Sequence, residues 1–467
     1  MVAMLLPLAA CGKKDKETSA YGVPTLTWLV PGDKQSDTAK VLEEANKIIE
    51  KEIGAKLDLQ FIDAGAFSER MTMKMASSDD YDLCFTGFIN QYAQAAENGG
   101  LLEIDGLLET VPKLKEAIPE AVWQAARYKG KLYAVPNLQI MTSTIAVQFK
   151  KDLVDKYGFD VGSVKTINDI EPFLKMVKEG EKGIYPYRTN YGITPWICSK
   201  YETINGDVAI DINDGTKALL RYNTPEFKEG VYKMYDWFKK GYIRPDVASV
   251  TDDTQDYNSG KYATTLTGWK PGIEETVKST LGYEVVFAPL NEPYMGMGAG
   301  TGTMIGISKK CKKPELAMKF IELINTNKEL YNLICFGIEG VHYTLTEDNK
   351  VKYIDGSGYA PKADWKFGNQ FNAMLIEGQE DGLWEATMEY NDRAKKSPLL
   401  GFSFSTENVV NEISQCSTVS SEYKVVNTGA QDPDTYFDEF VKKMDVAGAN
   451  KIVEEAQKQI DEFLDTK

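Results

Sequence analysis

The N-terminal part of the chain alternates between strand-like and helix-like patterns of hydrophobic and polar positions. Residues 25–30 and 81–86 form short apolar runs, and residues 56–63 alternate between apolar and polar side chains, as strands do. Residues 41–53 repeat apolar side chains with helical spacing, and residues 67–76 form a shorter helical segment. Strands that alternate with helices pair in parallel, so this order predicts an α/β fold.

One edge of the predicted sheet is suited to ligand binding. In parallel α/β sheets, ligands bind beyond the carboxyl ends of the strands. The turn at residues 31–33 follows the first strand, and residues 86–90 follow the third. We therefore expect Asp33 and Thr86 at a ligand-binding edge.

A second α/β unit follows a proline-terminated stretch at residues 128–136. Its clearest helix has Thr224 as N-cap, Pro225 at the first helical position and Gly241 after its end. A strand is expected at residues 283–289, and the C-terminal part of the chain is helical again. The pattern predicts two α/β lobes with C-terminal helices.

The composition is that of an acidic globular protein. The chain has 467 residues, of which 43% are hydrophobic and 26% are charged, and 69 acidic residues outnumber 53 basic ones. The net charge of −16 argues against nucleic acid or an anionic membrane surface as the main partner. At about 150 residues per domain, the length predicts roughly two to three domains.

The chain contains few motifs that indicate catalysis or metal binding. His342 is the single histidine, which excludes His-rich zinc sites and disfavours His-based triads. The acidic segment that begins at Asp211 has glycine at its fifth position and Tyr222 at its twelfth, so it does not fit an EF-hand. The sequence contains no P-loop and no dinucleotide fingerprint. We therefore expect no metal, no cofactor and no enzymatic activity.

The N-terminal residues predict a secretion signal. Residues 2–10 form an apolar run that is too short to cross a membrane but suits a signal peptide. The sequence Leu-Ala-Ala-Cys-Gly at residues 8–12 resembles the lipobox of bacterial lipoproteins. This resemblance implies that residues 1–10 are a signal peptide remnant, that Cys11 carries a lipid, and that residues 11–20 are a tether. The expected location is the extracellular face of the cytoplasmic membrane of a Gram-positive bacterium, with the lipid as the membrane contact.

Short motifs in a fixed order give the chain a family resemblance. They are Thr86-Gly87 at a strand end, Gly-Lys-Leu-Tyr-Ala-Val-Pro at 130–136, the helix and its Gly-Tyr-Ile-Arg-Pro-Asp exit at 224–246, Ser-Gly-Lys-Tyr-Ala at 259–263, Phe-Gly-Ile-Glu-Gly-Val-His-Tyr at 336–343 and Gly-Phe-Ser-Phe at 401–404. Together they resemble extracellular solute-binding proteins of ABC importers, in a lipoprotein branch with an extra C-terminal helical domain.

The resemblance implies a two-lobe fold like that of the type II periplasmic binding proteins, with hinge crossovers and a C-terminal helical extension. We expect lobe 1 at residues 21–135 and 293–338, and lobe 2, including the extension, at residues 136–292 and 339–467. Members of the family mostly serve sugar importers. The expected ligand is therefore a carbohydrate, an oligosaccharide or sugar derivative, and the expected partners of this monomer are ABC permease subunits.

The candidate ligand-binding residues are aromatic or polar. A sugar offers an apolar face to aromatic rings and offers hydroxyls to charged and amide side chains. For each candidate, the alternative is an ordinary structural role, such as core packing for a tryptophan or a satisfied buried position for the histidine. Core packing is favoured for Trp28, which lies inside a strand. The candidates are Asp33, Thr86, Trp196, Trp269, Lys270, Glu339, His342, Trp365, Asn369 and Gln370.

Three alternative functions fit the same sequence. The cargo of a binding protein could be a peptide or an acidic sugar. A secreted glycosidase would use two carboxylates, which 69 acidic residues could always supply. A structural surface lipoprotein would have no deep cleft between its lobes.

Overall fold

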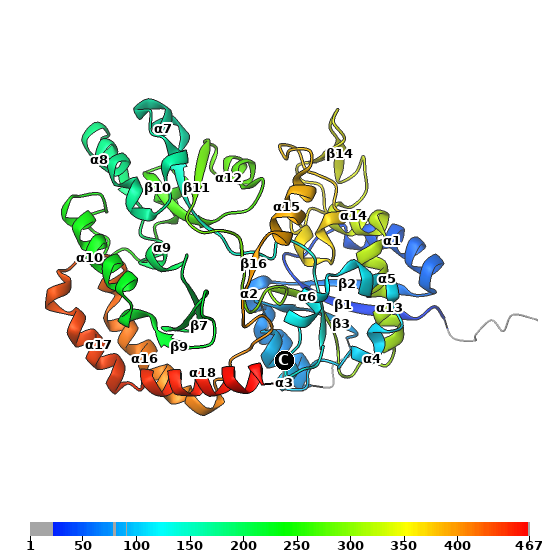
Figure 1. The fold of residues 1–467 in the computed structure, drawn as a ribbon. Helices are drawn as coiled ribbons and strands as arrows, with labels where there is room; N and C mark the ends of the chain where they lie inside the picture. The colour runs from blue at the N-terminus through cyan, green and yellow to red at the C-terminus, as the bar shows by residue number, and fades with distance from the viewer. Residues whose placement is uncertain (1–21, 78–80, 90, 466–467) are drawn as a thin grey trace, which may run out of the picture.

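The computed structural model of the protein describes residues 22–77, 81–89 and 91–465. The chain folds into two lobes joined by extended segments (Figure 1). Cys11, the predicted lipid-attachment residue, lies outside the described residues, as do the predicted signal and tether.

Two separate hydrophobic cores define the lobes. One core gathers buried residues between Leu26 and Leu138 and between Met304 and Ala373. The other gathers buried residues between Val147 and Leu290 and between Leu399 and Ile460. The chain therefore passes between the lobes three times, at residues 139–146, 291–303 and 374–398, which we call the first, second and third crossovers.

The first lobe is built on a five-stranded sheet in the order β2-β1-β3-β13-β4. Strands β2 and β3 pair in parallel with β1, as the sequence predicts, whereas β13 runs antiparallel to β3 and β4. The strands are β1 (Thr25–Pro31), β2 (Lys56–Ile62), β3 (Leu83–Gly87), β4 (Ala134–Pro136) and β13 (Thr303–Ile307). The helices of this lobe are α1 (Thr38–Ile53), α2 (Ala64–Ala76), α3 (Tyr92–Glu97), α4 (Asp105–Leu108), α5 (Pro112–Ala117), α6 (Glu120–Ala125), α13 (Pro314–Thr326) and α14 (Lys328–Phe336).

The second lobe contains a four-stranded sheet in the order β11-β5-β10-β6 and a three-stranded sheet in the order β7-β8-β9. Its strands are β5 (Ile145–Lys150), β6 (Tyr185–Tyr187), β7 (Tyr201–Asn205), β8 (Val208–Asp211), β9 (Ala218–Leu220), β10 (Tyr262–Gly268) and β11 (Val285–Pro289). Its helices are α7 (Lys151–Tyr157), α8 (Glu171–Gly180), α9 (Thr194–Ile197), α10 (Pro225–Lys239), α11 (Thr254–Asn258) and α12 (Ile273–Leu281).

Helices begin and end at the capping residues that the sequence predicts. Gly54 adopts a left-handed φ of 67° directly after α1, and its N–H donates to a carbonyl of the last turn. The Thr224 hydroxyl accepts a hydrogen bond from the N–H of Phe227 at 3.3 Å, and Pro225 opens α10. The predicted N-cap of α10 is therefore confirmed.

The second and third crossovers are held together by one side chain of β7. They pair in parallel through the short strands β12 (Tyr294–Met295) and β16 (Lys395–Lys396). The Glu202 carboxylate accepts hydrogen bonds from the Tyr294 hydroxyl at 2.7 Å and from the Ser397 hydroxyl at 2.6 Å. We infer that both crossovers stay with the second lobe at this point, and that the second crossover bends at its glycine-rich residues 298–302.

Residues 339–373 pack with the first lobe, which differs from the division that the sequence predicts at residue 339. Tyr343 and Val351, from the hairpin β14 (Tyr343–Leu345) and β15 (Val351–Tyr353), belong to the first core, as does Phe367. The Phe367 ring meets Trp28 edge-on, with ring centroids 5.8 Å apart. The apolar partners of this segment come from distant parts of the chain, so no local pattern marks its lobe.

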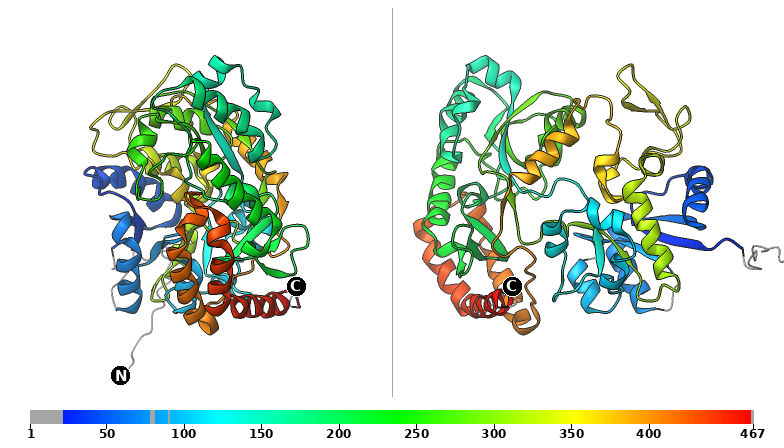
Figure 2. Two further views of the ribbon diagram at one scale, coloured as in Figure 1. Left: turned by 90° about the vertical axis from the view of Figure 1, so that its left-hand side faces the viewer. Right: turned by 45° about the vertical axis from the view of Figure 1, so that its right-hand side comes forward.

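Three C-terminal helices extend along one side of the second lobe (Figures 1 and 2). They are α16 (Val410–Glu422), α17 (Phe437–Val446) and α18 (Ala449–Leu464). The predicted apolar face of α18 is buried at Ile452 and Ile460. The Gln457 side chain of α18 accepts a hydrogen bond from the backbone N–H of Ala218 in β9 at 2.8 Å, which ties this helix to the lobe.

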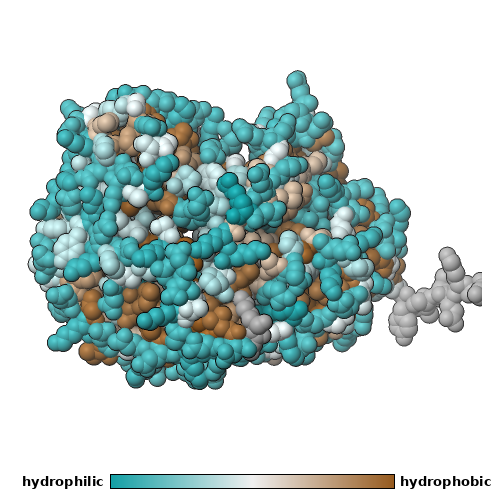
Figure 3. All heavy atoms as spheres, viewed as in Figure 1, coloured by the Kyte–Doolittle hydropathy of each residue, from teal (hydrophilic) through white to brown (hydrophobic). Residues whose placement is uncertain are grey.

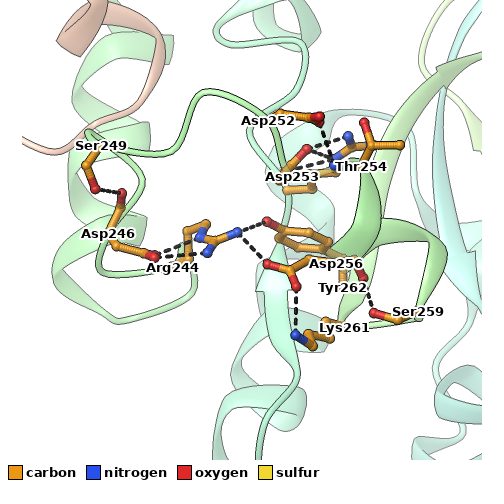
Figure 4. A network of polar contacts seen from close by, with 11 residues as sticks. Arg244, Asp246, Ser249, Asp252, Asp253, Thr254, Asp256, Ser259, Lys261 and Tyr262 are labelled. Atoms are coloured by element: carbon orange, nitrogen blue, oxygen red, sulfur yellow. Dashed lines mark hydrogen bonds and ion pairs between the residues drawn. The ribbon is translucent and has the colours of Figure 1, made fainter.

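A polar network fixes the connection from α10 to β10 (Figure 4). Arg244 donates to both oxygens of Asp246 at 2.7 and 2.9 Å, to Asp256 at 3.0 Å and to the Tyr262 hydroxyl at 2.9 Å. Lys261 donates to the other oxygen of Asp256 at 2.6 Å. These residues carry two motifs of the family resemblance, and because the charges of Arg244 and Lys261 are paired, we interpret the network as structural.

The outer rim of both lobes is mostly hydrophilic (Figure 3), in keeping with the acidic composition. Within the described ranges, none of the helices combines the length and the apolar character that spanning a membrane requires.

Candidate ligand-binding cleft

Two cavities lie between the lobes. Cavity A, of about 820 Å³, is lined by residues from 87–97 and 125–128 of the first lobe, from 297–302 of the second crossover and from 401–410. Cavity B has a volume of about 670 Å³. It is lined by residues from 336–370 of the first lobe, by residues from 270–279 of the second lobe and by Ile140 of the first crossover. Residues from 376–387, which reach into α15 (Leu383–Asp392), complete the lining. Both volumes are in the range of small-molecule sites.

An aromatic pair on the first lobe has one ring in each of the two cavities. Phe88, directly after β3, lines cavity A, and Trp365 lines cavity B. Their ring centroids are 5.8 Å apart, and Phe85 of β3 meets both rings edge-on. Phe88 is 62% exposed, which is unusual for so large an apolar side chain. The pair thus presents aromatic surface at the ligand edge that the strand order predicts.

Cavity B brings together three of the residues predicted from the sequence: Lys270, Trp365 and Gln370. Lys270 follows β10 of the second lobe, whereas Trp365 and Gln370 lie in two short 3₁₀ turns of the first lobe. The Gln370 side chain is fixed by a hydrogen bond from its Nε2 to the Asp364 carboxylate at 3.0 Å. Side chains from both lobes therefore face one cavity.

The sequence reasoning missed other aromatic residues of the cleft. Trp384 of α15 lines cavity B, and its Nε1 donates to the carbonyl of Ala373 at 2.7 Å. Tyr353 lines the same cavity. Phe88 follows Gly87 at the strand end that was expected to face a ligand, and this position is the signal that could have identified it.

Two predicted ligand contacts are structural residues instead. Trp196 lies in the second core, with its ring centroid 5.5 Å from that of Trp237 and its Nε1 donating to Asn168 at 3.0 Å. His342 is fully buried. Its Nδ1 accepts a hydrogen bond from the N–H of Ile338 at 2.9 Å, and its Nε2 lies 3.3 Å from the Asp37 carboxylate.

Five further candidates line neither cavity. Thr86 is buried within β3, and Asp33 and Glu339 are exposed at loop positions. The Asn369 side chain caps a 3₁₀ turn, with its Oδ1 accepting from the N–H of Phe371 at 3.1 Å. Trp269 lines a separate hollow of about 830 Å³. Its ring packs edge-on against Tyr390, with ring centroids 5.1 Å apart.

Lys366 is buried behind Trp365 at the ligand edge of β1. It is 3% exposed, and its Nζ donates to the carbonyl of Pro31 at 2.8 Å. Its ammonium lies 5.3 Å from the ring centroid of Phe61 and 5.2 Å from that of Phe367. Burial lowers the pKa of Lys366 to about 8. The side chain joins the turn that carries Trp365 to the end of β1.

The buried ammonium of Lys366 predicts a pH-dependent stability. Because its folded-state pKa of about 8 lies below the ordinary 10.5, the unfolded chain binds more protons between these values, and stability rises with pH there. As the pH rises, we expect the free energy of unfolding of wild type to increase by about 3 kcal/mol relative to that of Lys366→Met, mostly between pH 8 and pH 10. Paired urea titrations of the two proteins at pH 7, 8, 9 and 10 would measure it. A constant difference between them across this range would contradict the prediction.

Comparison with known proteins places the chain in a family. The model of the family described as bacterial extracellular solute-binding protein matches residues 32–330. The chain belongs to this family. The two-lobe fold and the family predicted from the sequence are confirmed. A second model, described as a domain of unknown function (DUF3502), matches residues 398–465.

Relatives match the chain along its length. The chain is 30% identical, over 100% of its own length and 97% of the relative's, to a protein of Streptococcus pneumoniae serotype 4 named carbohydrate ABC transporter substrate-binding protein. It is 29% identical to the N-glycan transport solute binding protein (NgtS) from Streptococcus pneumoniae. Its structure matches that crystal structure with a TM-score of 0.85 over 95% of this chain and 99% of the other.

The same relative has also been solved with saccharides, and those structures are less similar to this one. The TM-score is 0.73 for NgtS in complex with Man1GlcNAc and 0.69 for NgtS in complex with Man5GlcNAc. Since identity stays at 29% and coverage at 95% of this chain, the decrease reflects conformation. The lobes of this structure are thus arranged more like those of the first NgtS structure than like those of its two saccharide complexes.

Proposed function

We propose that this protein captures an uncharged oligosaccharide between its lobes and delivers it to the permease of an ABC importer. The observation that carries the proposal is the interlobe cleft, in which the exposed ring of Phe88 lines one cavity and the half-buried ring of Trp365 beside it lines the other. Aromatic faces stack on the C–H faces of sugars, and amide and charged groups bond their hydroxyls. The full-length similarity to a carbohydrate-binding component of a transporter supports the same cargo.

The charges of the cleft favour an uncharged cargo over an acidic sugar. Cavity B balances three lysines with three carboxylates: Lys270, Lys352, Lys362, Asp355, Asp364 and Glu377. In cavity A, Arg127 is paired with Asp105 at 2.7 Å, and Glu97 is paired with Lys129 at 2.6 Å. With a net charge of −16 on the chain, a polyanionic ligand would gain no attraction from the protein as a whole.

Capture by lobe closure follows from the arrangement of the crossovers. A ligand shifts a two-state equilibrium only by its differential affinity for the two states, and a saccharide that touches both lobes favours the closed state. Glu202 ties the second and third crossovers to the second lobe, and the second crossover bends at residues 298–302. The lower TM-scores to the saccharide complexes of NgtS support such a movement.

Binding without turnover suits the carboxylates of the cleft. A glycosidase needs one carboxyl group as acid and another as nucleophile or base. In cavity B, Asp364 accepts a hydrogen bond from Gln370, and Glu377 pairs with Lys352 at 2.7 Å. Two of the three carboxylates of this cavity are thus engaged with neighbouring side chains, and the relatives are named as transport components.

The proposed location is the extracellular face of the cytoplasmic membrane of a Gram-positive bacterium. A lipid on Cys11 would hold the protein, acting as a monomer, near its permease. Two of the relatives come from Streptococcus pneumoniae, and one of these two is named a maltooligosaccharide ABC transporter solute-binding lipoprotein.

A thermal-shift screen tests the proposed function. The panel contains neutral oligosaccharides, uronic-acid oligosaccharides and short peptides, and each hit is followed by calorimetry. A ligand at 100 times its Kd stabilises the folded state by about 2.7 kcal/mol, so a rise in Tm is expected with at least one neutral series. Chromatography should recover the sugar unchanged after incubation. A shift only with peptides or uronic acids, or cleavage of the sugar, would overturn the proposal.

A further inference from the structure

The C-terminal segment 401–410 forms one wall of cavity A. It faces residues of α3 and α6 in the first lobe across the cavity, and Met297 and Gly298 of the second crossover line the cavity with them. The segment belongs to residues 398–465, whose family model is described as a domain of unknown function. The start of this domain therefore lies in the cleft.

The wall is fixed to α18 of the second lobe. The Phe402 ring packs edge-on against Phe463, with ring centroids 5.6 Å apart. The backbone of Ser405 makes two hydrogen bonds with the side chain of Gln459, its N–H donating at 2.8 Å and its carbonyl accepting at 2.9 Å. A segment anchored in this way moves with the second lobe when the cleft closes.

The wall also reaches the first lobe at its start. Gly401 has a φ of 89°, and its N–H donates to the carbonyl of Met297 at 2.9 Å. A Cβ at this position would lie 2.8 Å from the carbonyl oxygen of Gln124 in α6, so glycine allows the close approach. The wall thus begins in contact with both the second crossover and α6.

The surface of cavity A suits part of a saccharide. Phe88 and Val410 are 62% and 56% exposed, and they offer apolar contacts from the two sides of the cavity. Ser403 and Thr406 offer hydroxyls from the wall, and Gln91 offers an amide from the first lobe. Among the described residues, the hydroxyls of Ser403 and Thr406 have no hydrogen-bond partner, so they remain available to the hydroxyls of a sugar.

We infer that cavity A is a distal saccharide subsite, that the C-terminal segment 401–410 is its second-lobe wall, and that this subsite makes the protein select long oligosaccharides over short ones. The inference rests on the proposed function. The rings of Phe88 in cavity A and Trp365 in cavity B lie 5.8 Å apart, so a sugar chain that occupies cavity B can continue over the aromatic pair into cavity A. A disaccharide fills one cavity only, whereas a longer oligosaccharide gains contacts with the wall.

Two wall variants test the inference by calorimetry. Ser403→Ala/Thr406→Ala removes the free hydroxyls, and Val410→Trp adds bulk to the cavity at an exposed position. The ligands are the disaccharide and the hexasaccharide of the malto-, manno- and N-acetylchito-oligosaccharide series. We expect wild type to bind a hexasaccharide at least tenfold more tightly than the disaccharide. The double variant should lose 3- to 10-fold in hexasaccharide affinity, and Val410→Trp should lose tenfold or more. Disaccharide affinity should stay within twofold.

A matched variant and distinct outcomes make the test decisive. Ser414→Ala/Ser417→Ala removes two hydroxyls from exposed positions of α16 outside both cavities, and it should leave every affinity unchanged. If wild type binds members of a series but the wall variants do not lower the preference for the hexasaccharide, the inference is wrong and the proposed function stands. If wild type binds the disaccharide and the hexasaccharide with equal affinity, the inference is also wrong. If wild type binds no saccharide in any series, the proposed function itself fails.

Discussion

Trp365→Ala is expected to weaken saccharide binding about 30-fold. Trp365 lies in cavity B beside the exposed ring of Phe88, so the substitution removes an indole face from the wall of the cavity. Truncation of a central aromatic contact costs about 2 kcal/mol of binding free energy, and each 1.4 kcal/mol is about tenfold in affinity. Calorimetry with the best neutral oligosaccharide of the screen would measure the loss.

Two further substitutions separate stacking from general damage. Trp365→Phe keeps an aromatic face and should recover most of the affinity lost in Trp365→Ala. Trp196→Phe changes a tryptophan that packs in the second core, away from both cavities, and should leave the affinity unchanged while lowering Tm slightly. Equal affinities of wild type and Trp365→Ala would show that the aromatic pair does not hold the ligand.

The sequence predicts those parts of the fold whose signals are local. Helix ends with a capping residue, such as Thr224 with Pro225, are determined by atoms within a few residues of one another, and the structure has them where expected. The parallel pairing of the first three strands also follows from their order along the chain. The lobe of residues 339–373 could not be predicted, because the ring of Phe367 packs on Trp28, far away in the sequence.

The site was less accessible to sequence reasoning, for a physical reason. Lys270 and Trp365 come from different lobes, and their meeting in cavity B depends on how the crossovers place the lobes. His342 was a candidate because it lies in a glycine-flanked segment, but its ring is fully buried, and its polar partner Asp37 lies 305 residues away in the sequence. Phe88 has no motif of its own, and its exposure is visible only once β3 is in place.

A second large effect is expected at Gly87, the last residue of β3, which directly precedes Phe88. Gly87 has a φ of 138°, which side-chain-bearing residues rarely adopt. A Cβ there would overlap the carbonyl oxygen of Gly302 in the second crossover and would lie 2.6 Å from its carbonyl carbon. The overlap is with backbone, and the crossover is held in place by the hydrogen bond from the N–H of Phe88 to the carbonyl of Gly302 at 2.8 Å.

We therefore expect Gly87→Ala to destabilise the first lobe by about 4 kcal/mol, the sum of a disfavoured φ and a forced backbone displacement. Gly99→Ala is the matched control, because Gly99 also has a positive φ, of 69°, but nothing lies within 4 Å of its would-be Cβ. That variant should cost only about 1 kcal/mol. Urea denaturation of the three proteins would measure both costs.

The displacement of Phe88 in Gly87→Ala should also weaken saccharide binding under conditions where the variant is still folded. If the two variants lost equal stability, the contact between Gly87 and the second crossover would not constrain the cleft, and the aromatic pair would be positioned by the first lobe alone.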